Sequence, residues 1–386
     1  MCSGYPDALS IAYLGVRMIG TLRVCAVALA ALWLGGVAVA EPLKTRNVVF
    51  VVSDGLRWQE VFSGADPLLL GDKESNWTDA KTLKARYWDD DVQKRRAKLM
   101  PFLWGTIAKE GQIFGNRTKG SLATVTNDQW FSFPGYNEMS SGVADPKIRS
   151  NEFGINPNVT VYEWLNTLPE LKGKVEIYGT WDTFHDIFNE GRSHLTIRSG
   201  RNLVDAADTS PRGQLLRELY ETQVMIEDPD PTDAMLHIVV RDHLAKSHPR
   251  VLFVGYGDTD NYAHMNRYDG LLSAAHNADA FVADLWRQLQ SIPEYKGTTT
   301  LIFTADHGRG RRRHDWIDHG VKQPGSDEIW VAAIGPDVPA VGERQNVAPI
   351  TQSQLAATVA AFMGQDFRAF KPEAAPSLLD ALGVHH

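Results

Sequence analysis

The sequence contains almost no cysteine. Among its 386 residues only Cys2 and Cys25 are cysteines, and both lie within the first forty residues. The rest of the chain therefore cannot form an internal disulfide, bind a metal through a thiolate or use a cysteine nucleophile. Any metal site after residue 40 must be built from other groups.

Positive charge is also scarce. The chain has 39 Lys and Arg residues against 47 Asp and Glu residues, a formal charge of −8, and without residues 1–40 the balance is 37 against 46, or −9. A general nucleic-acid binder needs a basic surface to contact the phosphates. The charge therefore argues against nucleic acid as a partner, and any anion-binding site must be local.

Long apolar runs are confined to the start of the chain. From Val24 to Ala40 the sequence is almost wholly apolar, follows Arg17 and Arg23, and ends in Ala-Val-Ala. This pattern is typical of a signal peptide that is removed on export. The run is near the lower limit for a membrane span, so an uncleaved anchor is the alternative. We predict a signal peptide over 1–40 and a periplasmic or secreted mature chain that is not bound to a membrane.

Five short apolar runs predict buried strands. They show no polar alternation, as expected for central strands covered on both faces. The runs are Val48–Ser53, Val175–Gly179, Val251–Gly255, Thr300–Thr304 and Ile329–Ile334. Helical patterns occur at Ala274–Gln290 and Gln352–Met363. We therefore predict an α/β fold with a central, mostly parallel sheet and helices on both faces, forming a single catalytic domain over 41–386. The polar stretch 63–98 is predicted to be an insertion or cap.

Three of these runs lead into acidic residues. Asp54 follows the first run, Asp258 and Asp260 follow the third, and Asp306 follows the fourth. In open α/β sheets, ligands bind at the carboxyl ends of the strands. One Asp in such a place usually caps a helix, but three such ends, two with histidines nearby, predict a shared site.

The histidines have the spacing of metal ligands. Asp260 and His264 are four residues apart, so on a helix they would share one face and bind one ion. Asp306 and His307 are adjacent at a strand exit, and His319 follows twelve residues later. Aspartate and neutral histidine are what zinc takes where thiolates are absent. Two ions about 3.5–4 Å apart would hold a phosphoryl oxygen between them.

Several neighbouring residues leave alternatives open. His314 and Asp258 are spare ligands or ordinary surface residues. Arg309 and the run Arg311–Arg313 would bind a second anionic group of a substrate, or form a solvated loop.

The stretch Ser132–Gly142 opens with a Ser-x-Pro turn, which alone is typical of a loop. The order of motifs changes this interpretation. An Asp-Gly after the first strand, the Ser-x-Pro turn, the Asp-x-x-x-His pair and the Ala-Asp-His-Gly strand end together resemble the alkaline phosphatase superfamily. That group includes nucleotide pyrophosphatases/phosphodiesterases, cofactor-independent phosphoglycerate mutases and sulfatases. The resemblance covers residues 47 to about 364.

The nearest likeness is to the nucleotide pyrophosphatase/phosphodiesterase pattern, in which Thr-Phe-Pro-Asn-His leads to Thr-Gly. Ser132 falls on the nucleophilic Thr, and Ser141-Gly142 on the closing pair. The resemblance implies a phosphoryl-binding role for Asn151. It also implies one ion held by Asp54, Ser132, Asp306 and His307, and another held by Asp260, His264 and His319.

Two departures limit what the resemblance implies. Gly135-Tyr136 replaces Asn-His, so nucleotide specificity is not carried over. Sulfatases of the superfamily need an Arg where this chain has Tyr136 to convert the Cys or Ser to formylglycine, so a modified Ser132 is not expected.

The sequence as a whole predicts an exported hydrolase of small phosphate esters, above all a phosphomonoesterase. It would use two divalent ions, predicted to be Zn²⁺, and a phosphoserine intermediate on Ser132. A phosphodiesterase or nucleotide pyrophosphatase, a sulfatase, and an inactive metal-stabilised envelope binding protein are the alternatives. Trp181 and Phe184 would shape a leaving-group pocket or belong to the core. The substrate and the oligomeric state are left open.

Overall fold

A computed structural model describes residues 42–225 and 230–384 of the chain. The predicted signal peptide, with its alternative of an uncleaved anchor, lies outside these residues. Within the two described ranges, no helix is both long enough and apolar enough to cross a membrane.

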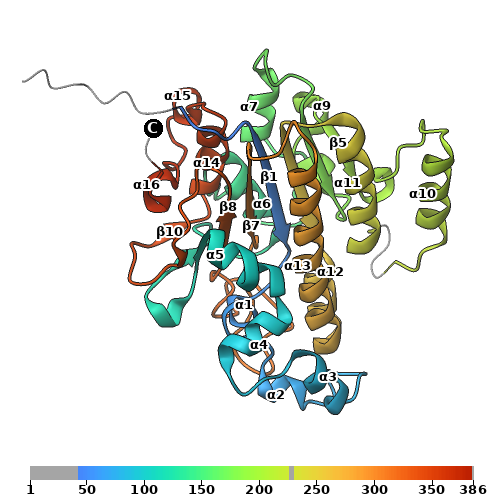
Figure 1. Ribbon diagram of the computed structural model, residues 1–386, viewed down its shortest axis with the longest axis vertical. Coiled ribbons are helices and arrows are strands. Elements are labelled where there is room, and N and C mark those ends of the chain that lie inside the picture. Colours follow the sequence, from blue (N-terminus) through green and yellow to red (C-terminus); the bar gives the residue numbers. More distant parts are fainter. Residues whose placement is uncertain (1–41, 226–229, 385–386) are drawn as a thin grey trace, which may run out of the picture. The chain divides into compact units, whose positions relative to one another are not determined.

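An eight-stranded sheet forms the centre of the fold (Figure 1). Its order is β5-β4-β6-β1-β7-β8-β2-β9. The strands are β1 (Asn47–Ser53), β2 (Gly111–Phe114), β4 (Val175–Gly179), β5 (Thr196–Ser199), β6 (Val251–Tyr256), β7 (Thr299–Thr304), β8 (Val331–Ile334) and β9 (Gly342–Glu343). From β5 to β7 all neighbours are parallel, and β8 runs antiparallel to both β7 and β2. The short strands β3 (Ala123–Thr124) and β10 (Ile350–Thr351) form a separate parallel pair.

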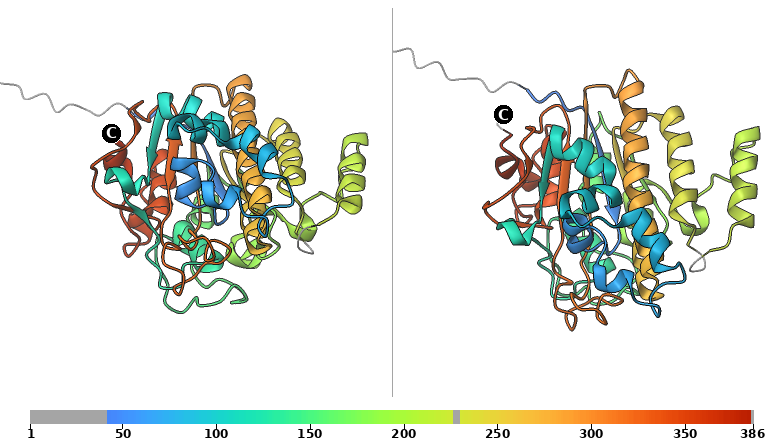
Figure 2. Two further views of the ribbon diagram at one scale, coloured as in Figure 1. Left: turned by 90° about the horizontal axis from the view of Figure 1, so that it is seen from below. Right: turned by 60° about the horizontal axis from the view of Figure 1, so that its bottom comes forward.

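Helices connect these strands and cover the sheet. They are α1 (Trp58–Ser63), α2 (Pro67–Leu70), α3 (Ala80–Tyr87), α4 (Val92–Leu99), the π-helix η1 (Leu103–Ile107), α5 (Ala108–Glu110), η2 (Arg117–Lys119), α6 (Ser132–Ser141), α7 (Val161–Thr167), α8 (Phe184–Ile187), α9 (Glu190–Ser193), η3 (Gly200–Asn202), α10 (Pro211–Thr222), α11 (Asp233–Ser247), α12 (Asp258–His264), α13 (Tyr268–Ser291), α14 (Gln354–Phe362), α15 (Phe367–Phe370) and α16 (Leu379–Leu382). Helices α7, α11, α13 and α14 contact strands of the sheet, whereas α10 lies beyond α11, which it contacts (Figure 2).

Both faces of the sheet are buried. Because successive side chains of a strand point to opposite faces, Val49 and Val51 of β1 join one hydrophobic core, while Val48, Phe50 and Val52 join another. The first core includes apolar side chains of α11 and α13, and the second includes side chains of α6, α7 and α14. This arrangement explains why the strand sequences are apolar throughout. The predicted α/β fold class, with a mostly parallel sheet and helices on both faces, is confirmed.

All five predicted strands are present, as β1, β4, β6, β7 and β8, and the two helical patterns correspond to α13 and α14. Strands β2, β5 and β9 were not predicted, because their sequences, Gly-Gln-Ile-Phe, Thr-Ile-Arg-Ser and Gly-Glu, contain no continuous apolar run. The polar stretch 63–98 folds into the small helices α2, α3 and α4, and α2 and α4 pack against α13. Its role as a cap stays a prediction.

The predicted Ser-x-Pro turn that opens Ser132–Gly142 is wrong, because residues Ser132–Ser141 form the helix α6. Pro134 is tolerated there since it is the third residue of the helix, where the backbone N–H has no partner inside the helix. Gly135 allows α6 to pack closely on the end of β7. A Cβ atom at this position would lie 2.6 Å from the carbonyl oxygen of Asp306.

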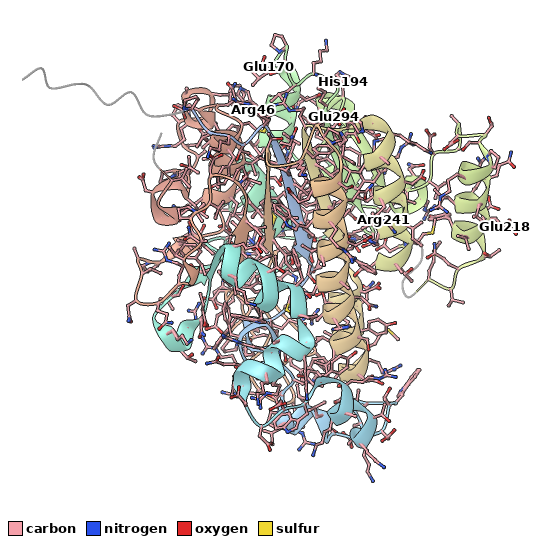
Figure 3. All side chains as sticks on the ribbon, viewed as in Figure 1. Arg46, Glu170, His194, Glu218, Arg241 and Glu294 are labelled. Atoms are coloured by element: carbon pink, nitrogen blue, oxygen red, sulfur yellow. The ribbon has the colours of Figure 1, made fainter. Side chains whose placement is uncertain are left out.

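The central strands β6, β1 and β7 are parallel neighbours, so their carboxyl ends meet at one edge of the sheet. Arg46, which directly precedes β1, lies at the opposite end together with Glu170 and His194 (Figure 3). The predicted ligands are therefore gathered away from these residues.

Candidate active site

The first cluster of predicted ligands consists of Asp54, Asp306 and His307, all buried. The His307 Nε2 atom lies 3.3 Å from Asp54 Oδ1 and 3.5 Å from Asp306 Oδ2. His307 Nδ1 lies 2.8 Å from the carbonyl oxygen of Gly308 and donates to it, which leaves the Nε2 lone pair facing the carboxylates. Ligand atoms bound at about 2.0–2.1 Å to a tetrahedral zinc are about 3.3 Å apart, so this spacing suits an ion.

The carboxylates of this cluster are poorly satisfied by the protein. Asp54 Oδ1 and Asp306 Oδ2 are buried without a hydrogen-bond partner among the described residues. Burial and the neighbouring Asp54 raise the pKa of Asp306 well above its usual value. Burial lowers the pKa of His307, but Asp306 and Asp54 outweigh it and raise the value to about 9. Buried charges of one sign are costly unless a cation pairs with them, so a metal ion fits this cluster.

The second cluster combines Asp260 and His264 of α12 with His319 from the loop after β7. His264 Nε2 lies 3.1 Å from Asp260 Oδ2 and 3.0 Å from His319 Nε2. Two ring nitrogens at this distance suit either a shared proton or a shared ion. Burial, with His307 and Arg309 nearby, lowers the pKa of His319 to about 2, so its ring is neutral and its nitrogen can bind a metal.

Arg309 is tied to this second cluster. Its buried guanidinium bonds to the Asp260 carboxylate and also donates to the carbonyl oxygen of Ile317, at 2.8 Å. Burial raises the pKa of Asp260, but Arg309 and His264 outweigh it and hold that pKa well below its usual value. Arg309 therefore keeps Asp260 ionised and fixes its orientation.

Ser132 is the first residue of α6, and its Oγ atom lies 3.3 Å from His307 Nε2. The preceding backbone is strained, since Trp130 has a φ of 57°, a value that a bulky residue rarely adopts. The carbonyl oxygen of Trp130 accepts a hydrogen bond of 3.1 Å from the backbone N–H of Gly320, beside His319. The start of α6 and the histidine loop are thus held together.

Asn151 also lies against this helix. Its side-chain oxygen accepts a hydrogen bond of 2.9 Å from the backbone N–H of Phe133. With the oxygen engaged, the amide nitrogen remains to donate into the adjoining cavity, which Asn151 lines.

A cavity of about 320 Å³ opens beside both clusters. Asp54, Ser132, Asn151, Asp260, His264 and His319 all line it. The site therefore combines a hydroxyl, an amide donor and two candidate metal clusters in one space.

Solved structures share this fold at low sequence identity. The alkaline phosphatase PafA matches with a TM-score of 0.55 and 10% identity, over 85% of this chain and 97% of that chain. A protein of the alkaline phosphatase superfamily from Vibrio parahaemolyticus matches with a TM-score of 0.50 and 14% identity, over 85% and 69% of the two chains. The 2-O GAG sulfatase BT1596 matches with a TM-score of 0.53 and 14% identity, over 88% and 74%. The chain has the fold of the alkaline phosphatase superfamily. No protein-family model and no curated protein sequence matches it.

Within this alkaline phosphatase-like fold, the structure brings together every ligand that the sequence predicted. The spare candidates lie elsewhere. His314 is exposed. Asp258 accepts from the backbone N–H of Asp233, at 3.2 Å, and Asp233 in turn accepts from Gly257, at 2.7 Å. Asp258 therefore caps the start of α11, and Asp233 caps the start of α12.

The arginine cluster is dispersed. Arg311 pairs with Glu328, and Arg313 lies 2.9 Å from Asp72, while Arg312 is exposed. None of the four arginines lines the cavity. A common role in binding a second anionic group is therefore not supported by their placement.

Sequence reasoning missed the role of Tyr136. This buried side chain donates a hydrogen bond of 2.9 Å to Asp54 Oδ2. Burial and the Asp54 carboxylate raise its pKa well above the usual value, so the phenol keeps its proton and acts as a donor. The sequence marked the position, because Tyr136 stands where the related pattern has histidine, but nothing in the sequence indicated Asp54 as its partner.

We expect Tyr136→Phe to weaken the binding of an ion at the Asp54 cluster about 10–100-fold, as is typical when a group that orients a ligand is removed. The ring would still fill its place, so the fold should persist. Metal titration followed by calorimetry would measure the change. Tyr162→Phe is the matched control, since burial alone raises the pKa of that tyrosine. Equal metal affinity in both variants would contradict a positioning role for Tyr136.

Proposed function

We propose that the chain is an exported, metal-dependent hydrolase of small phosphate esters that forms a phosphoserine on Ser132. The observation that carries this proposal is the position of Ser132 Oγ, 3.3 Å from His307 Nε2. The same nitrogen lies 3.3 Å from the unsatisfied Asp54 Oδ1 and 3.5 Å from the unsatisfied Asp306 Oδ2. Structures with the same fold include an alkaline phosphatase and sulfatases, which supports a hydrolase in general terms.

Two divalent ions fit the donor sets of the site, one at Asp54, Asp306, His307 and Ser132, the other at Asp260, His264 and His319. When bound, such ions neutralise phosphoryl oxygens and lower the pKa of a bound hydroxyl or water. The donors are carboxylates and imidazoles only, which favours zinc.

The chain's own groups supply the remaining parts of the reaction. Ser132 presents its Oγ atom to the phosphorus at the start of α6, where the helix dipole favours an anion. As the Oγ–P bond forms, the bond from phosphorus to the leaving alcohol breaks. Asn151 would donate its amide to a phosphoryl oxygen. In the second step a water oxygen bonds to phosphorus as the Oγ–P bond breaks, and a proton from that water returns to Ser132 Oγ.

Protein purified without chelator should contain about two ions per chain, with zinc predominant. Elemental analysis of the native protein and of a chelator-treated sample would measure this. The treated sample should lose activity and regain it with added zinc. A single calcium ion that survives substitution of the histidines would contradict the assignment.

A panel of matched monoester, diester and sulfate reporters tests the reaction class. We expect the monoester to give the highest kcat/KM, because the site offers two cation positions for a phosphoryl group of high charge. A diester or sulfate preference would replace the proposed activity by one of the alternatives. No turnover of any reporter by the zinc-loaded protein would favour a binding protein.

A further inference from the structure

One glutamate of α6 is fully buried, and neutral groups surround its carboxylate. Glu138 lies in the second half of this helix, and both of its side-chain oxygens accept hydrogen bonds. Within the residues that the structure describes, its donors are the backbone N–H and hydroxyl of Thr126, the backbone N–H and side-chain amide of Asn127, and the hydroxyl of Ser353. A buried carboxylate is costly unless hydrogen bonds replace its water. These donors replace it, although the proposed chemistry does not use the residue.

The same hydrogen bonds attach the segment before Ser132 to α6. The Thr126 hydroxyl lies 2.7 Å from Glu138 Oε1. The backbone and side-chain nitrogens of Asn127 lie 2.8 and 2.9 Å from Glu138 Oε2. Hydrogen bonds to a carboxylate are roughly twice as strong as those between neutral groups. Residues 126 and 127 are therefore held firmly against the helix that begins with Ser132.

Asn127 extends this attachment toward Ser132. Its side-chain nitrogen bonds to Glu138, while its side-chain oxygen accepts from the backbone N–H groups of Gln129 and Trp130, both at 3.0 Å. Because one planar amide makes all of these bonds, the carboxylate fixes the direction of the amide oxygen. Trp130 is the residue with the strained φ of 57°, and such a conformation persists only where its surroundings hold it.

The strained residue is connected to both parts of the candidate site. Phe131 alone separates Trp130 from Ser132, so the backbone at Trp130 sets the direction in which the chain enters α6. The carbonyl oxygen of Trp130 also accepts the hydrogen bond of 3.1 Å from Gly320, the neighbour of His319. A shift of Trp130 would therefore move the Ser132 hydroxyl and the loop that carries His319.

A second connection runs from Glu138 to a candidate metal ligand. Its partner Ser353 directly follows Gln352, which is fully buried. The side-chain amide of Gln352 donates a hydrogen bond of 2.5 Å to the carbonyl oxygen of Asp306. Glu138 thus lies between the segment that leads to Ser132 and the segment that supports Asp306.

We propose that Glu138 is a positioning residue, which holds the Ser132 hydroxyl and the His319 loop in place through Asn127 and Trp130. Glu138 is fully buried, so it acts through these residues and does not touch a substrate. The kinetic part of the inference rests on the proposed function, whereas the placement of His319 can be measured without turnover.

Glu138→Gln tests the proposal, because it keeps the shape of the side chain but places an NH₂ group where one oxygen accepts hydrogen bonds. The zinc-loaded variant should lose about 10–100-fold in kcat on the monoester reporter, since a small displacement of an attacking atom costs up to about 10²-fold. KM should change less than about threefold, as for a residue outside the cavity. Steady-state kinetics at several substrate concentrations would separate the two constants.

Hydrogen exchange provides a measurement that does not depend on turnover. The backbone N–H groups of Gln129 and Trp130 bond to Asn127 and not to Glu138, so they report whether the effect is transmitted. In Glu138→Gln both should exchange at least about tenfold faster, because local opening of this segment becomes easier. Zinc titration by calorimetry should also show weaker binding at the cluster that contains His319, by about tenfold, as when a group that orients a ligand is lost.

Glu163→Gln is the matched control. Glu163 is a buried glutamate on the neighbouring helix α7, and its partner is Arg192, at 2.7 Å. This variant should leave kcat, the zinc affinity and the exchange of Gln129 and Trp130 as in the wild type. A loss of activity caused only by removing a buried carboxylate would appear in both variants.

Asn127→Ala keeps the test available if Glu138→Gln fails to fold. It removes the connecting amide but leaves Thr126 and Ser353 bonded to the carboxylate. The same loss of kcat at unchanged KM is expected. Because the two residues act in one chain of contacts, the double variant should be no slower than the slower single variant.

The outcomes distinguish this proposal from the proposed function. Unchanged exchange at Gln129 and Trp130 in Glu138→Gln would overturn the positioning role, and so would faster exchange with a normal kcat. If the wild-type protein hydrolyses no reporter, the hydrolase function fails and the zinc titration decides. Weaker zinc binding at the His319 cluster in Glu138→Gln would then uphold the positioning role, and equal binding would overturn it.

Discussion

Replacing Ser132 with alanine is expected to lower kcat by roughly 10⁴–10⁶-fold, the scale seen when a nucleophile is removed from a catalytic unit. The hydroxyl belongs to the first residue of α6, lines the cavity and lies 3.3 Å from His307 Nε2. Alanine fits the first turn of a helix, so α6 should form as before. The Asp54, Asp306 and His307 ligands remain, so most of the metal should be retained.

The measurement pairs steady-state rates with elemental analysis of the same sample. Ser140→Ala is the matched control, because Ser140 lies in the same helix and is buried without a hydrogen-bond partner among the described residues. It should keep near-normal activity. Rapid quenching of the wild-type reaction should reveal phosphate on Ser132. A Ser132→Ala variant that keeps more than about a tenth of the rate would point to direct attack by water.

The candidate ligand residues could be identified from the sequence because each is indicated by a local pattern. An Asp at the end of a buried strand, or an Asp and a His four residues apart, needs only the strand or helix to form. Strands β6, β1 and β7 are long and apolar enough to be recognised, and their adjacency brings Asp54, Asp260 and Asp306 together. The central strands, and the edge of the sheet at which the candidate site lies, could therefore be predicted from the sequence.

The supporting contacts could not be predicted because they join distant segments. The hydrogen bond from Tyr136 to Asp54 spans 82 residues of sequence, and the bond from Arg309 to Asp260 spans 49. Neither residue has a local pattern that indicates its partner. The start of α6 was misjudged for a related reason. Pro134 and Gly135 favour a turn when only local preferences are considered, but packing of the helix on Asp306 favours a helix with glycine at that contact.

The second large effect concerns the third ligand of the Asp260 cluster. Two histidines follow His307 in one loop, His314 and His319, and each was a candidate from sequence. In the structure His319 Nε2 lies 3.0 Å from His264 Nε2 and 3.9 Å from the Asp260 carboxylate. Its side chain is 13% exposed, whereas His314 is an exposed residue beyond the arginines.

The His319 ring is also held in place by its surroundings. Its centroid lies 4.2 Å from that of His307 and 6.4 Å from that of Phe131, which precedes Ser132. Gly320, with a φ of 94°, makes the tight turn that follows and bonds to Trp130. A metal ligand needs such a fixed ring, because any freedom would be lost on binding.

We therefore expect His319→Ala to lose about one ion per chain and more than about 100-fold in kcat/KM, a larger effect than loss of a group that only orients a ligand. His314→Ala should change the rate less than about threefold, as is usual for a surface substitution. Elemental analysis and reporter kinetics on both variants, with added zinc as a rescue, would measure the difference. Zinc in excess should restore His319→Ala only in part, since Asp260 and His264 still offer two ligands. If His314→Ala instead lost the ion while His319→Ala kept it, the loop would have to rearrange on metal binding, and the assignment of the second cluster would be wrong.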